Sequence, residues 1–344
     1  MAYDGLLNDI QTIVRLGTPS RVPVFTCSEE FDVKWYGRGR YNEIILDAGR
    51  LADCWIAAIE EFDYDWAWLQ IDDCIEFEPL GVGCKGEGNI LRATCEYLPA
   101  EPATLKKLKM PDPKKDGRMP IHLEAIRKIR KRFGDRVLVT GRTAAPFSST
   151  ALLYGIQETM MLMLTEPQLV RDTCDFFLEL QTMWGLAQYE AGAHALWIGD
   201  CNAMSNLVSL KQYTNFAFEP CRRIVANYKK AGGLTILHNS EIRLPYLEKS
   251  AEMKPDILSM GPEADLAEVK RSLGRKIALV GNIDQVKYLM NGSPQEVAQE
   301  TARIMNLGKP GGAYVFNTGD MVPRDVPDEN MRVMVRVARE QSRY

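Results

Sequence analysis

The residues of this chain best suited to chemistry are polar side chains that come directly after short apolar runs. His238 ends one of these runs and begins the sequence His-Asn-Ser-Glu, and it is one of only three histidines in the chain. An imidazole in this position could ligate a metal ion, act as a general acid or base, or make a structural hydrogen bond. Because catalytic groups of barrel enzymes lie where strands end, a functional role for His238 is favoured.

Polar residues follow the other apolar runs in the same way. Each buried polar group costs free energy unless it is paired, so a ring of such residues indicates a ligand site rather than a purely structural protein. The alternative for each Asp or Asn is to cap the helix that follows. The complete set is Thr26, Cys27, Glu29, Asp72, Asp73, Arg142, Thr143, Asp200, Asn202, His238, Asn239, Ser240, Glu241, Ser259, Glu263, Asn282, Asp284, Asn317, Thr318 and Asp320.

The apolar runs that precede these residues number eight, and stretches with helical periodicity separate them. This alternation predicts a parallel sheet, and runs that are apolar on consecutive positions indicate strands covered on both faces. We therefore predict an α/β fold of the (β/α)8 TIM-barrel class. The expected strands are 22–26, 66–71, 137–141, 195–199, 234–238, 256–260, 277–281 and 313–317, and the expected helices are 45–61, 119–133, 151–191 (as two), 211–230, 242–252, 264–273, 294–306 and 327–341.

A doubly wound sheet is the structural alternative. Such a sheet usually has five or six strands and often a glycine-rich phosphate turn after the first. Here Gly37-Arg38-Gly39 is not that turn, because it does not open a helix directly after the first strand. The barrel is preferred.

The whole chain, 1–344, is expected to form a single barrel domain with one insertion. Residues 72–118 depart from the strand–helix alternation and contain a Pro- and Lys-rich stretch. We predict that they form a hairpin and a loop folded over the barrel mouth. Further along the chain, Ser293-Pro294-Gln295-Glu296 predicts a helix that begins with a capping box.

Composition narrows the classes of function. The net charge of −4 offers no electrostatic footprint for nucleic acid or an anionic membrane. No apolar run approaches the ~20 residues that span a bilayer, and the first residues do not resemble a secretory signal. The eight cysteines are scattered without a Cys-x-x-Cys pair, which is typical of reduced thiols. We expect a cytoplasmic enzyme.

Several motifs in the second half of the chain resemble the uroporphyrinogen decarboxylase-like superfamily. The resemblance covers most of residues 150–344 and is loose before that. It implies a (β/α)8 barrel, in agreement with the strand count. The motifs are Ala191-Gly192-Ala193-His194-Ala195-Leu196-Trp197-Ile198-Gly199-Asp200, Gly281-Asn282-Ile283-Asp284, Leu289-Met290-Asn291-Gly292-Ser293-Pro294-Gln295-Glu296-Val297, Gly311-Gly312-Ala313-Tyr314-Val315-Phe316-Asn317, Val322-Pro323 and Val326-Pro327-Asp328-Glu329-Asn330.

The superfamily resemblance implies one of two activities. Its decarboxylases carry arginines near the N-terminus that grip the carboxylates of the porphyrinogen, whereas this chain has Thr26-Cys27-Ser28-Glu29-Glu30 there. The other branch comprises corrinoid-dependent methyltransferases, which move a methyl group to or from a cobalamin carried by a partner protein. The chain resembles the members that pass the methyl group from a methylated corrinoid protein to tetrahydrofolate in glycine betaine demethylation.

Many methyltransferases of this branch bind zinc through a His-x-Cys motif and a later cysteine. The matching positions are His238, Ser240 and Asp320, so both sulfur ligands are missing and no zinc is expected. The N5 nitrogen of tetrahydrofolate is already nucleophilic and needs no metal. The alternatives are a methyl donor (such as a methyl ether):corrinoid-protein methyltransferase with an oxygen-ligated zinc, using His238 with Glu241 or Asp200, and a non-catalytic binding barrel.

The resemblance also suggests roles for individual residues. His238 and Asp320 are expected at the methyl-transfer centre, where they would position N5 or receive its proton. The expected substrate-binding residues carry carboxylates or amides that can read a pterin edge. They are Asp200, Asn202, Asn239, Asn282, Asp284 and Asn317.

Overall fold

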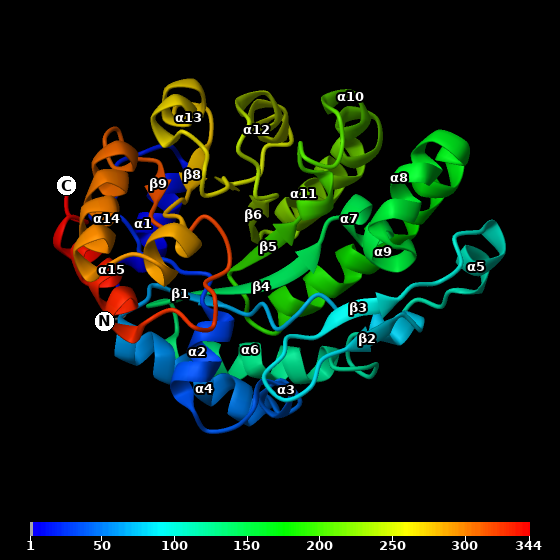
Figure 1. The fold of residues 1–344 in the computed structure, drawn as a ribbon, viewed down its shortest axis with the longest axis horizontal. Helices are drawn as coiled ribbons and strands as arrows, with labels where there is room; N and C mark the ends of the chain where they lie inside the picture. The colour runs from blue at the N-terminus through cyan, green and yellow to red at the C-terminus, as the bar shows by residue number, and fades with distance from the viewer. Residues whose placement is uncertain (1–2) are drawn as a thin grey trace.

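The computed structural model describes residues 3–344, and its main sheet is parallel throughout (Figure 1). The strand order is β1-β4-β5-β6-β7-β8-β9. Each neighbouring pair runs in the same direction, with the first register at Trp66 opposite Leu138 and the last at Val280 opposite Val315. The strands are β1 (Trp66–Trp68), β4 (Leu138–Ala144), β5 (Ala195–Gly199), β6 (Leu234–His238), β7 (Ile257–Ser259), β8 (Ala278–Val280) and β9 (Tyr314–Val315).

The segment 22–25 closes this sheet into a barrel. On one side Val24 forms a parallel bridge with Phe316, and the Phe25 N–H donates to the Phe316 carbonyl at 2.9 Å. On the other side the Asp65 N–H donates to the Val24 carbonyl at 3.0 Å. The segment therefore takes the place of the eighth strand between β9 and β1. The predicted (β/α)8 fold class is confirmed.

Helices surround the barrel in the positions expected of strand–helix units (Figure 1). The capping box predicted at Ser293 is confirmed, because its side chain accepts from the Glu296 N–H while Glu296 accepts from the Ser293 N–H. The α-helices are α1 (Leu6–Val14), α2 (Glu29–Tyr36), α3 (Tyr41–Ile44), α4 (Ala48–Phe62), α5 (Pro102–Lys107), α6 (Met119–Phe133), α7 (Pro146–Tyr154), α8 (Ile156–Thr165), α9 (Pro167–Glu190), α10 (Leu210–Gln212), α11 (Glu219–Lys230), α12 (Leu244–Ala251), α13 (Leu266–Leu273), α14 (Pro294–Gly308) and α15 (Asp328–Glu340). The 3-10 helices are η1 (Glu78–Leu80) and η2 (Cys201–Ala203), and the π-helices are η3 (Tyr213–Phe218) and η4 (Gln285–Met290).

The stretch predicted as two helices over 151–191 forms three, which is a correction. Gly155 separates α7 from α8 because its φ of +90° lies outside the helical region. Pro167 begins α9 at the first helical position, where its missing N–H costs nothing. The prediction also missed α1, α2, α3 and α5.

Apolar side chains fill the barrel in a cluster separate from the one under the helices. The interior cluster contains Phe25, Trp66, Trp68 and Trp197, and it continues down to α1. Leu6, Ile10 and Ile13 of α1 are fully buried in it. Helix α1 therefore plugs one end of the barrel, and the cavity described below lies at the other end.

The insertion after β1 contains an antiparallel hairpin of β2 (Gly83–Lys85) and β3 (Ala93–Glu96). Its turn is fixed to the rest of the molecule, because the Asn42 N–H donates to the Gly88 carbonyl and Arg324 donates to the Asn89 carbonyl. The hairpin and α5 extend along the side of the barrel that carries α8 and α9 (Figure 1). Across residues 3–344, the structure contains no helix with the length and apolar character needed to cross a bilayer.

Candidate active site

The strands place one set of side chains around a small cavity at the carboxyl end of the barrel. Successive residues of a strand point to opposite faces, so every second residue faces the interior. Thus Trp197 and Gly199 of β5 and His238 of β6 face the cavity, whose volume is about 70 Å³. The lining residues are Trp68, Gln70, Asp73, Arg142, Trp197, Gly199, Cys201, His238, Asp320 and Met321.

A chain of hydrogen bonds runs across this cavity from β7 to the loop after β9. The Ser259 hydroxyl lies 2.9 Å from His238 Nδ1, and the Ser240 hydroxyl lies 2.9 Å from His238 Nε2. Ser240 then donates to Asp320 Oδ2 at 2.5 Å. Because Ser240 gives its only proton to Asp320, it accepts from Nε2–H, and Nδ1 accepts from Ser259. The geometry thus defines the tautomer of a neutral His238.

Burial and charge act in opposite directions on His238. Burial lowers the pKa of its imidazole, and the Asp320 carboxylate, with one oxygen 4.0 Å from Nε2, raises it. Burial dominates, so the ring is neutral near pH 7. Asp320 is the solvent-exposed end of this hydrogen-bond chain, because its side chain is 36% exposed whereas that of His238 is 6% exposed. The arrangement can pass a proton between the mouth and the barrel interior.

Indole rings form one wall of the cavity. Trp68 and Trp197 lie with their ring centroids 5.2 Å apart, and Trp66 stacks beneath Trp68 at 5.4 Å. Trp197 also contacts the His238 ring at 4.6 Å. Together they make a rigid apolar surface beside the hydrogen-bond chain. This surface can hold a planar ring or a methylated cation.

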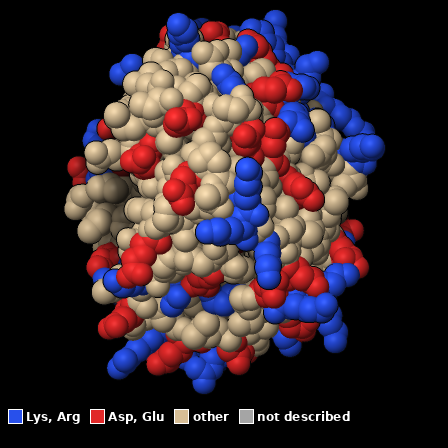
Figure 2. Space-filling model, turned by 90° about the vertical axis from the view of Figure 1, so that its right-hand side faces the viewer, with Lys and Arg blue, Asp and Glu red and all other residues tan. Residues whose placement is uncertain are grey.

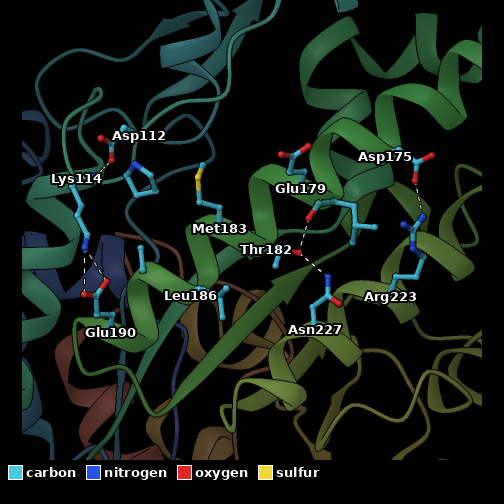
Figure 3. Close-up of a pocket in the computed structure, with 13 residues that line it drawn as sticks. Asp112, Lys114, Asp175, Glu179, Thr182, Met183, Leu186, Glu190, Arg223 and Asn227 are labelled. Atoms are coloured by element: carbon cyan, nitrogen blue, oxygen red, sulfur yellow. Dashed lines mark hydrogen bonds and ion pairs between the residues drawn. The ribbon is translucent and has the colours of Figure 1, made fainter.

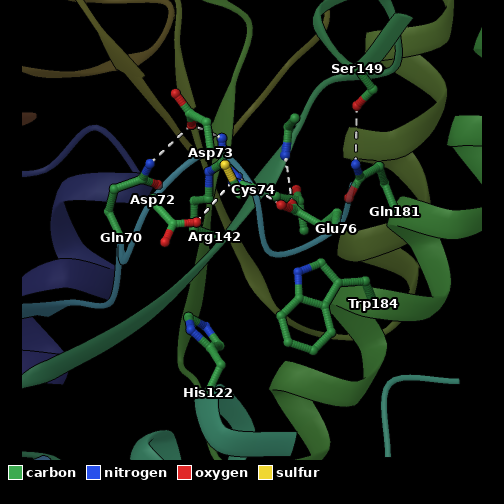
Figure 4. Close-up of polar contacts among 12 residues, drawn as sticks. Gln70, Asp72, Asp73, Cys74, Glu76, His122, Arg142, Ser149, Gln181 and Trp184 are labelled. Carbon is green, nitrogen blue, oxygen red and sulfur yellow. Dashed lines mark hydrogen bonds and ion pairs between the residues drawn. The ribbon is translucent and has the colours of Figure 1, made fainter. Parts of the chain in front are cut away.

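Arg142 lies opposite, between two carboxylates of the segment that follows β1 (Figure 4). It donates to Glu76 Oε2 at 2.8 Å and also to Asp73. Glu76 is fully buried, whereas the Asp73 side chain is 51% exposed. Arg142 is therefore already neutralised, and the half-exposed carboxylates of Asp73 and Asp320 leave the mouth acidic.

Hydrogen bonds between the backbone of β4 and the Gln188 side chain fix the position of Arg142. Gln188 of α9 accepts from the Arg142 N–H at 2.8 Å and donates to its carbonyl at 2.9 Å. A Cβ on Gly141 would lie 2.1 Å from Gln188 Oε1, so only glycine lets this amide reach the strand. The buried His122 contacts the same oxygen, with its Nε2 3.0 Å away.

Two of the predicted substrate-binding residues point away from the cavity. Asp200 and Asn239 each follow an interior position by one residue, so strand alternation turns them toward the helices. Asp200 accepts from the Ser148 hydroxyl at 2.7 Å, and Asn239 donates to Ser250 at 3.3 Å. Burial raises the pKa of Asp200 to about 6. The structure does not bring these two residues to the His238 cavity.

The remaining predicted residues also have other partners. Asn282 donates to the carbonyls of Gly261, Pro262 and Ala264, which fixes the loop after β7. Asp284 caps η4 through the N–H groups of Val286 and Lys287.

Asn317 and Asn202 lie close to the barrel mouth, but neither lines the cavity. The Asn317 amide faces the interior and donates to the Cys27 sulfur at 3.5 Å. Asn202 belongs to η2, where its N–H donates to the Ser148 hydroxyl at 3.1 Å. Of the predicted site residues, the structure therefore joins His238 and Asp320 and separates the six others from them.

Sequence reasoning missed Trp68, Trp197, Gln70, Cys201 and Met321 as lining residues. The tryptophans could have been found from the alternation of side chains along a strand. Trp66, Trp68 and Gln70 occupy every second position of one predicted strand, and Trp197 lies two residues before Gly199. Asp73 and Arg142 belonged to the ring of polar strand-end residues but were not selected from it. Met321 could not have been placed, because it lies in an irregular loop after β9.

The donor atoms at His238 do not fit a sulfur-ligated zinc site. The two positions that the family resemblance matched to sulfur ligands hold Ser240 and Asp320, and these are hydrogen-bonded to each other. The thiol that lines this cavity is that of Cys201, which lies 4.0 Å from Ser240 Oγ. Within the described part of the chain, no three His, Cys, Asp or Glu side chains are arranged to hold a metal ion.

A larger cavity lies elsewhere, on the outer surface between α9, α11 and residues 112–114 (Figure 3). Its volume is about 790 Å³, and ion pairs close its two ends: Lys114 with Glu190, and Asp175 with Arg223. Figure 2 shows the side of the molecule that lies to the right in Figure 1, and on this side acidic and basic side chains are mixed with uncharged areas. This groove is lined by no cysteine, serine or histidine and by none of the polar strand-end residues, so we assign the chemistry to the smaller cavity.

Comparison with known proteins places this geometry in context. The model of the uroporphyrinogen decarboxylase (URO-D) family matches residues 11–341. The uroporphyrinogen decarboxylase of Neisseria meningitidis is 26% identical, over 89% of this chain and 86% of that protein. The methylated-thiol–coenzyme M methyltransferase of Methanosarcina mazei is also 26% identical, over 86% and 78%. Among solved structures, a methyltransferase from Methanosarcina mazei superposes with a TM-score of 0.87 at 21% identity, covering 97% of this chain and 98% of that one.

Proposed function

Because the chain belongs to the uroporphyrinogen decarboxylase (URO-D) family, we propose that it is a corrinoid-dependent methyltransferase that passes a methyl group from a methylated corrinoid protein to tetrahydrofolate. The observation that carries the proposal is the His238–Ser240–Asp320 chain at the cavity. A methyl acceptor that is already nucleophilic needs a proton acceptor and an oriented pocket, and this chain offers both. A relative that activates a thiol would instead present sulfur ligands at the positions of Ser240 and Asp320.

The other activity found in the family is less compatible with the site. A porphyrinogen presents several carboxylates, which require cationic partners. Here the mouth carries Asp73 and Asp320, and the one arginine in the cavity is paired with Glu76 as well as Asp73. The carboxylates of Asp73 and Asp320 would repel the carboxylates of a decarboxylase's substrate.

The reaction would transfer a methyl cation equivalent between two substrates. The lone pair of N5 forms the new N–CH3 bond, the Co–CH3 bond breaks, and its electron pair remains on the cobalt of the partner's corrinoid. The methylated nitrogen then loses its proton. Asp320 is positioned to accept that proton at the mouth, while Ser240 and the neutral His238 keep its carboxylate oriented.

The pterin would meet different residues from those expected from the sequence. Asp73 and Gln70 lie side by side at the mouth, with Gln70 Nε2 donating to Asp73 Oδ1 at 3.1 Å. A carboxylate can accept from two adjacent N–H groups of a pterin, and the nearby amide can read an adjacent acceptor. The indole rings of Trp68 and Trp197, which are tilted by 55° to each other, supply apolar faces beside them. We therefore propose Asp73 and Gln70 as the polar groups that orient the pterin.

The proposal can be tested with free methylcobalamin and tetrahydrofolate. The purified protein should convert them to 5-methyltetrahydrofolate, detected by chromatography together with loss of the methylcobalamin spectrum. His238→Ala should abolish turnover. Uroporphyrinogen serves as the comparison substrate: release of CO2 from it, with no methyl transfer, would replace this proposal with decarboxylation.

A second candidate function is methyl transfer from a small methylated ammonium or sulfonium compound to the corrinoid protein. The observation that favours it is the pairing of two indole faces, Trp68 and Trp197, with the carboxylates of Asp73 and Asp320 in a cavity of only about 70 Å³. Such surroundings attract a methylated cation. Calorimetry with tetramethylammonium separates the candidates, because binding lost in Trp197→Ala would favour the methylated-cation donor.

A further inference from the structure

The indole N–H of Trp68 is a buried hydrogen-bond donor that the protein itself leaves without an acceptor. Trp68 is 5% exposed and lines the His238 cavity. No group within residues 3–344 accepts a hydrogen bond from its Nε1, and no other residue described as lining this cavity has a buried side-chain nitrogen or oxygen without a partner. Because a buried polar group without a partner costs free energy, folded proteins retain few of them. A donor of this kind at a cavity is a place where the acceptor of a ligand can bind.

Two neighbouring indoles have their N–H groups satisfied. Trp55 Nε1 donates to the Trp68 carbonyl at 2.7 Å, and Trp66 Nε1 donates to the Thr140 hydroxyl at 2.6 Å. Thr140 pairs with Trp68 in the register of β1 and β4, so Trp66 reaches a hydroxyl one level further along the barrel. The same step from Trp68 leads to Arg142, whose guanidinium carries donors only. At that level β4 offers no side-chain acceptor.

Packing holds the Trp68 ring in place. Trp66 stacks on it with the ring centroids 5.4 Å apart and the planes at 11°, and Trp197 lies against it at 5.2 Å. The hydrogen bond from Trp55 fixes the backbone of Trp68 at its carbonyl. A ring confined in this way is not free to turn toward an acceptor elsewhere in the barrel. The donor is therefore preorganised, and a ligand that supplies the acceptor does not have to order it.

We propose that Trp68 is a further substrate-binding residue, whose Nε1–H donates a hydrogen bond to the 4-oxo oxygen of the pterin. The inference rests on the proposed function and identifies the edge of the pterin that enters the cavity. In a pterin the 4-oxo group adjoins N3–H, which together with the 2-amino group forms the pair of donors assigned to Asp73. Asp73 and Trp68 line the same cavity. The neighbouring donors and acceptor of the ligand thus meet an acceptor and a donor of the protein.

A contact at the 4-oxo oxygen also sets the direction of the reacting nitrogen. The carbon that carries this oxygen is joined to N5 through a single ring carbon, so the oxygen and N5 lie on the same side of the ring system. With the oxygen held by Trp68 and N3–H held by Asp73, the position of N5 relative to the mouth is fixed. The oxygen has two lone pairs, so Gln70 can donate to it as well. Tetramethylammonium has no acceptor and would leave the Trp68 donor unpaired.

The test compares tetrahydrofolate with its 4-amino analogue, tetrahydroaminopterin, in which an amino donor replaces the acceptor oxygen. Calorimetry gives the ratio of the two dissociation constants for the wild-type protein, for Trp68→Phe and for the control Trp66→Phe. In Trp68→Phe the preference for tetrahydrofolate should fall by roughly 10-fold, which corresponds to the loss of one hydrogen bond. Trp66→Phe removes an indole N–H that is already paired with Thr140, so its ratio should equal that of the wild type.

Nuclear magnetic resonance provides a second measurement on the unaltered protein. In the wild-type protein with 15N-labelled tryptophan, the Trp68 indole proton is assigned from its Overhauser contacts with the Trp66 and Trp197 rings. Tetrahydrofolate should shift this signal downfield and slow its exchange with deuterium from the solvent. Tetrahydroaminopterin should do neither, because it offers a donor in place of the oxygen.

The outcomes separate this contact from the function on which it rests. If tetrahydrofolate binds and is methylated, but the ratio is unchanged in a folded Trp68→Phe, the contact is wrong and the proposed function stands. An indole signal that tetrahydrofolate leaves in place has the same meaning, and it decides the matter if Trp68→Phe does not fold. If the wild-type protein does not bind tetrahydrofolate at all, both the contact and the proposed function are overturned.

Discussion

At the scale of single residues, Asp320 is the part of the hydrogen-bond chain that reaches the mouth. Asp320→Asn keeps the size of the side chain but removes its capacity to accept a proton, so kcat for methyl transfer should fall by roughly 10²-fold. Asp325→Asn is the matched control, because this carboxylate in the same loop is 59% exposed and pairs with Lys34. Equal kcat values for the two variants would remove Asp320 from the reaction.

Asp200 gives a prediction about stability rather than binding. Burial raises its pKa from 3.8 to about 6, so the folded protein binds this proton more tightly than the unfolded chain does. Stability contributed by Asp200 is therefore present at low pH and is lost as the pH rises from about 4 to about 6. Asp200→Asn should be more stable than wild type at pH 8, by at most about 3 kcal/mol, and no more stable at pH 4.

Denaturant unfolding of both proteins at the two pH values measures this difference. Tetrahydrofolate affinity should change little in Asp200→Asn, because the side chain contacts Ser148 rather than the cavity. A large loss of affinity in the folded variant would return Asp200 to the substrate site and contradict the geometry described above.

At the scale of elements, the contact between β4 and α9 positions Arg142. Gly141→Ala would place a methyl group 2.1 Å from Gln188 Oε1, so the strand or the helix must shift. We expect unfolding free energy to fall by about 1–3 kcal/mol, as for other overpacked core positions. Gly199→Ala is the control, since its Cβ would meet only the Thr143 carbonyl at 3.9 Å.

Thermal unfolding of the two glycine variants would provide the comparison. The structure predicts a clear decrease in Tm for Gly141→Ala and a much smaller one for Gly199→Ala. Similar Tm values would mean that the Gln188 side chain can adopt another conformation, and that its contact with β4 contributes little to stability.

Helix α1 gives a second prediction at this scale. Ile10 is fully buried where the helix plugs the barrel, so Ile10→Ala should cost about 2–5 kcal/mol of unfolding free energy. Leu7→Ala is the control because Leu7 only packs against the edge of the same cluster. Urea unfolding should separate the two variants, and equal losses would show that the plug is not an integral part of the core.

At the scale of the whole molecule, the order of strands and helices could be predicted because each apolar run is followed by a helical stretch. The residues that line the cavity could not be predicted as completely. Polar residues at strand ends were treated alike, yet one residue of offset decides whether a side chain faces the interior, as with Gly199 and Asp200. Residues such as Met321, which depend on loop geometry, carry no pattern that could be read in advance.

His238 and Asp320 were expected together only through the family resemblance. Asp320 lies 80 residues beyond Ser240 and 82 beyond His238, and local sequence contains no information about such contacts. The closed sheet is what joins them: β6 carries His238 to the cavity, and the loop after β9 carries Asp320 to its rim. Fold class could be read from periodicity, whereas the site required the tertiary structure.

The closing contact of the barrel joins segments from opposite ends of the chain. Cys27 and Thr318, whose hydrogen bond spans this seam, are 291 residues apart in sequence. During synthesis, the segment 22–25 must therefore wait for β9 to leave the ribosome before it can pair on that side. Until then the apolar face of α1 has no finished barrel to cover it. A nascent chain of this protein should depend on a chaperone until the last strand emerges, and the cavity should be among its last parts to form.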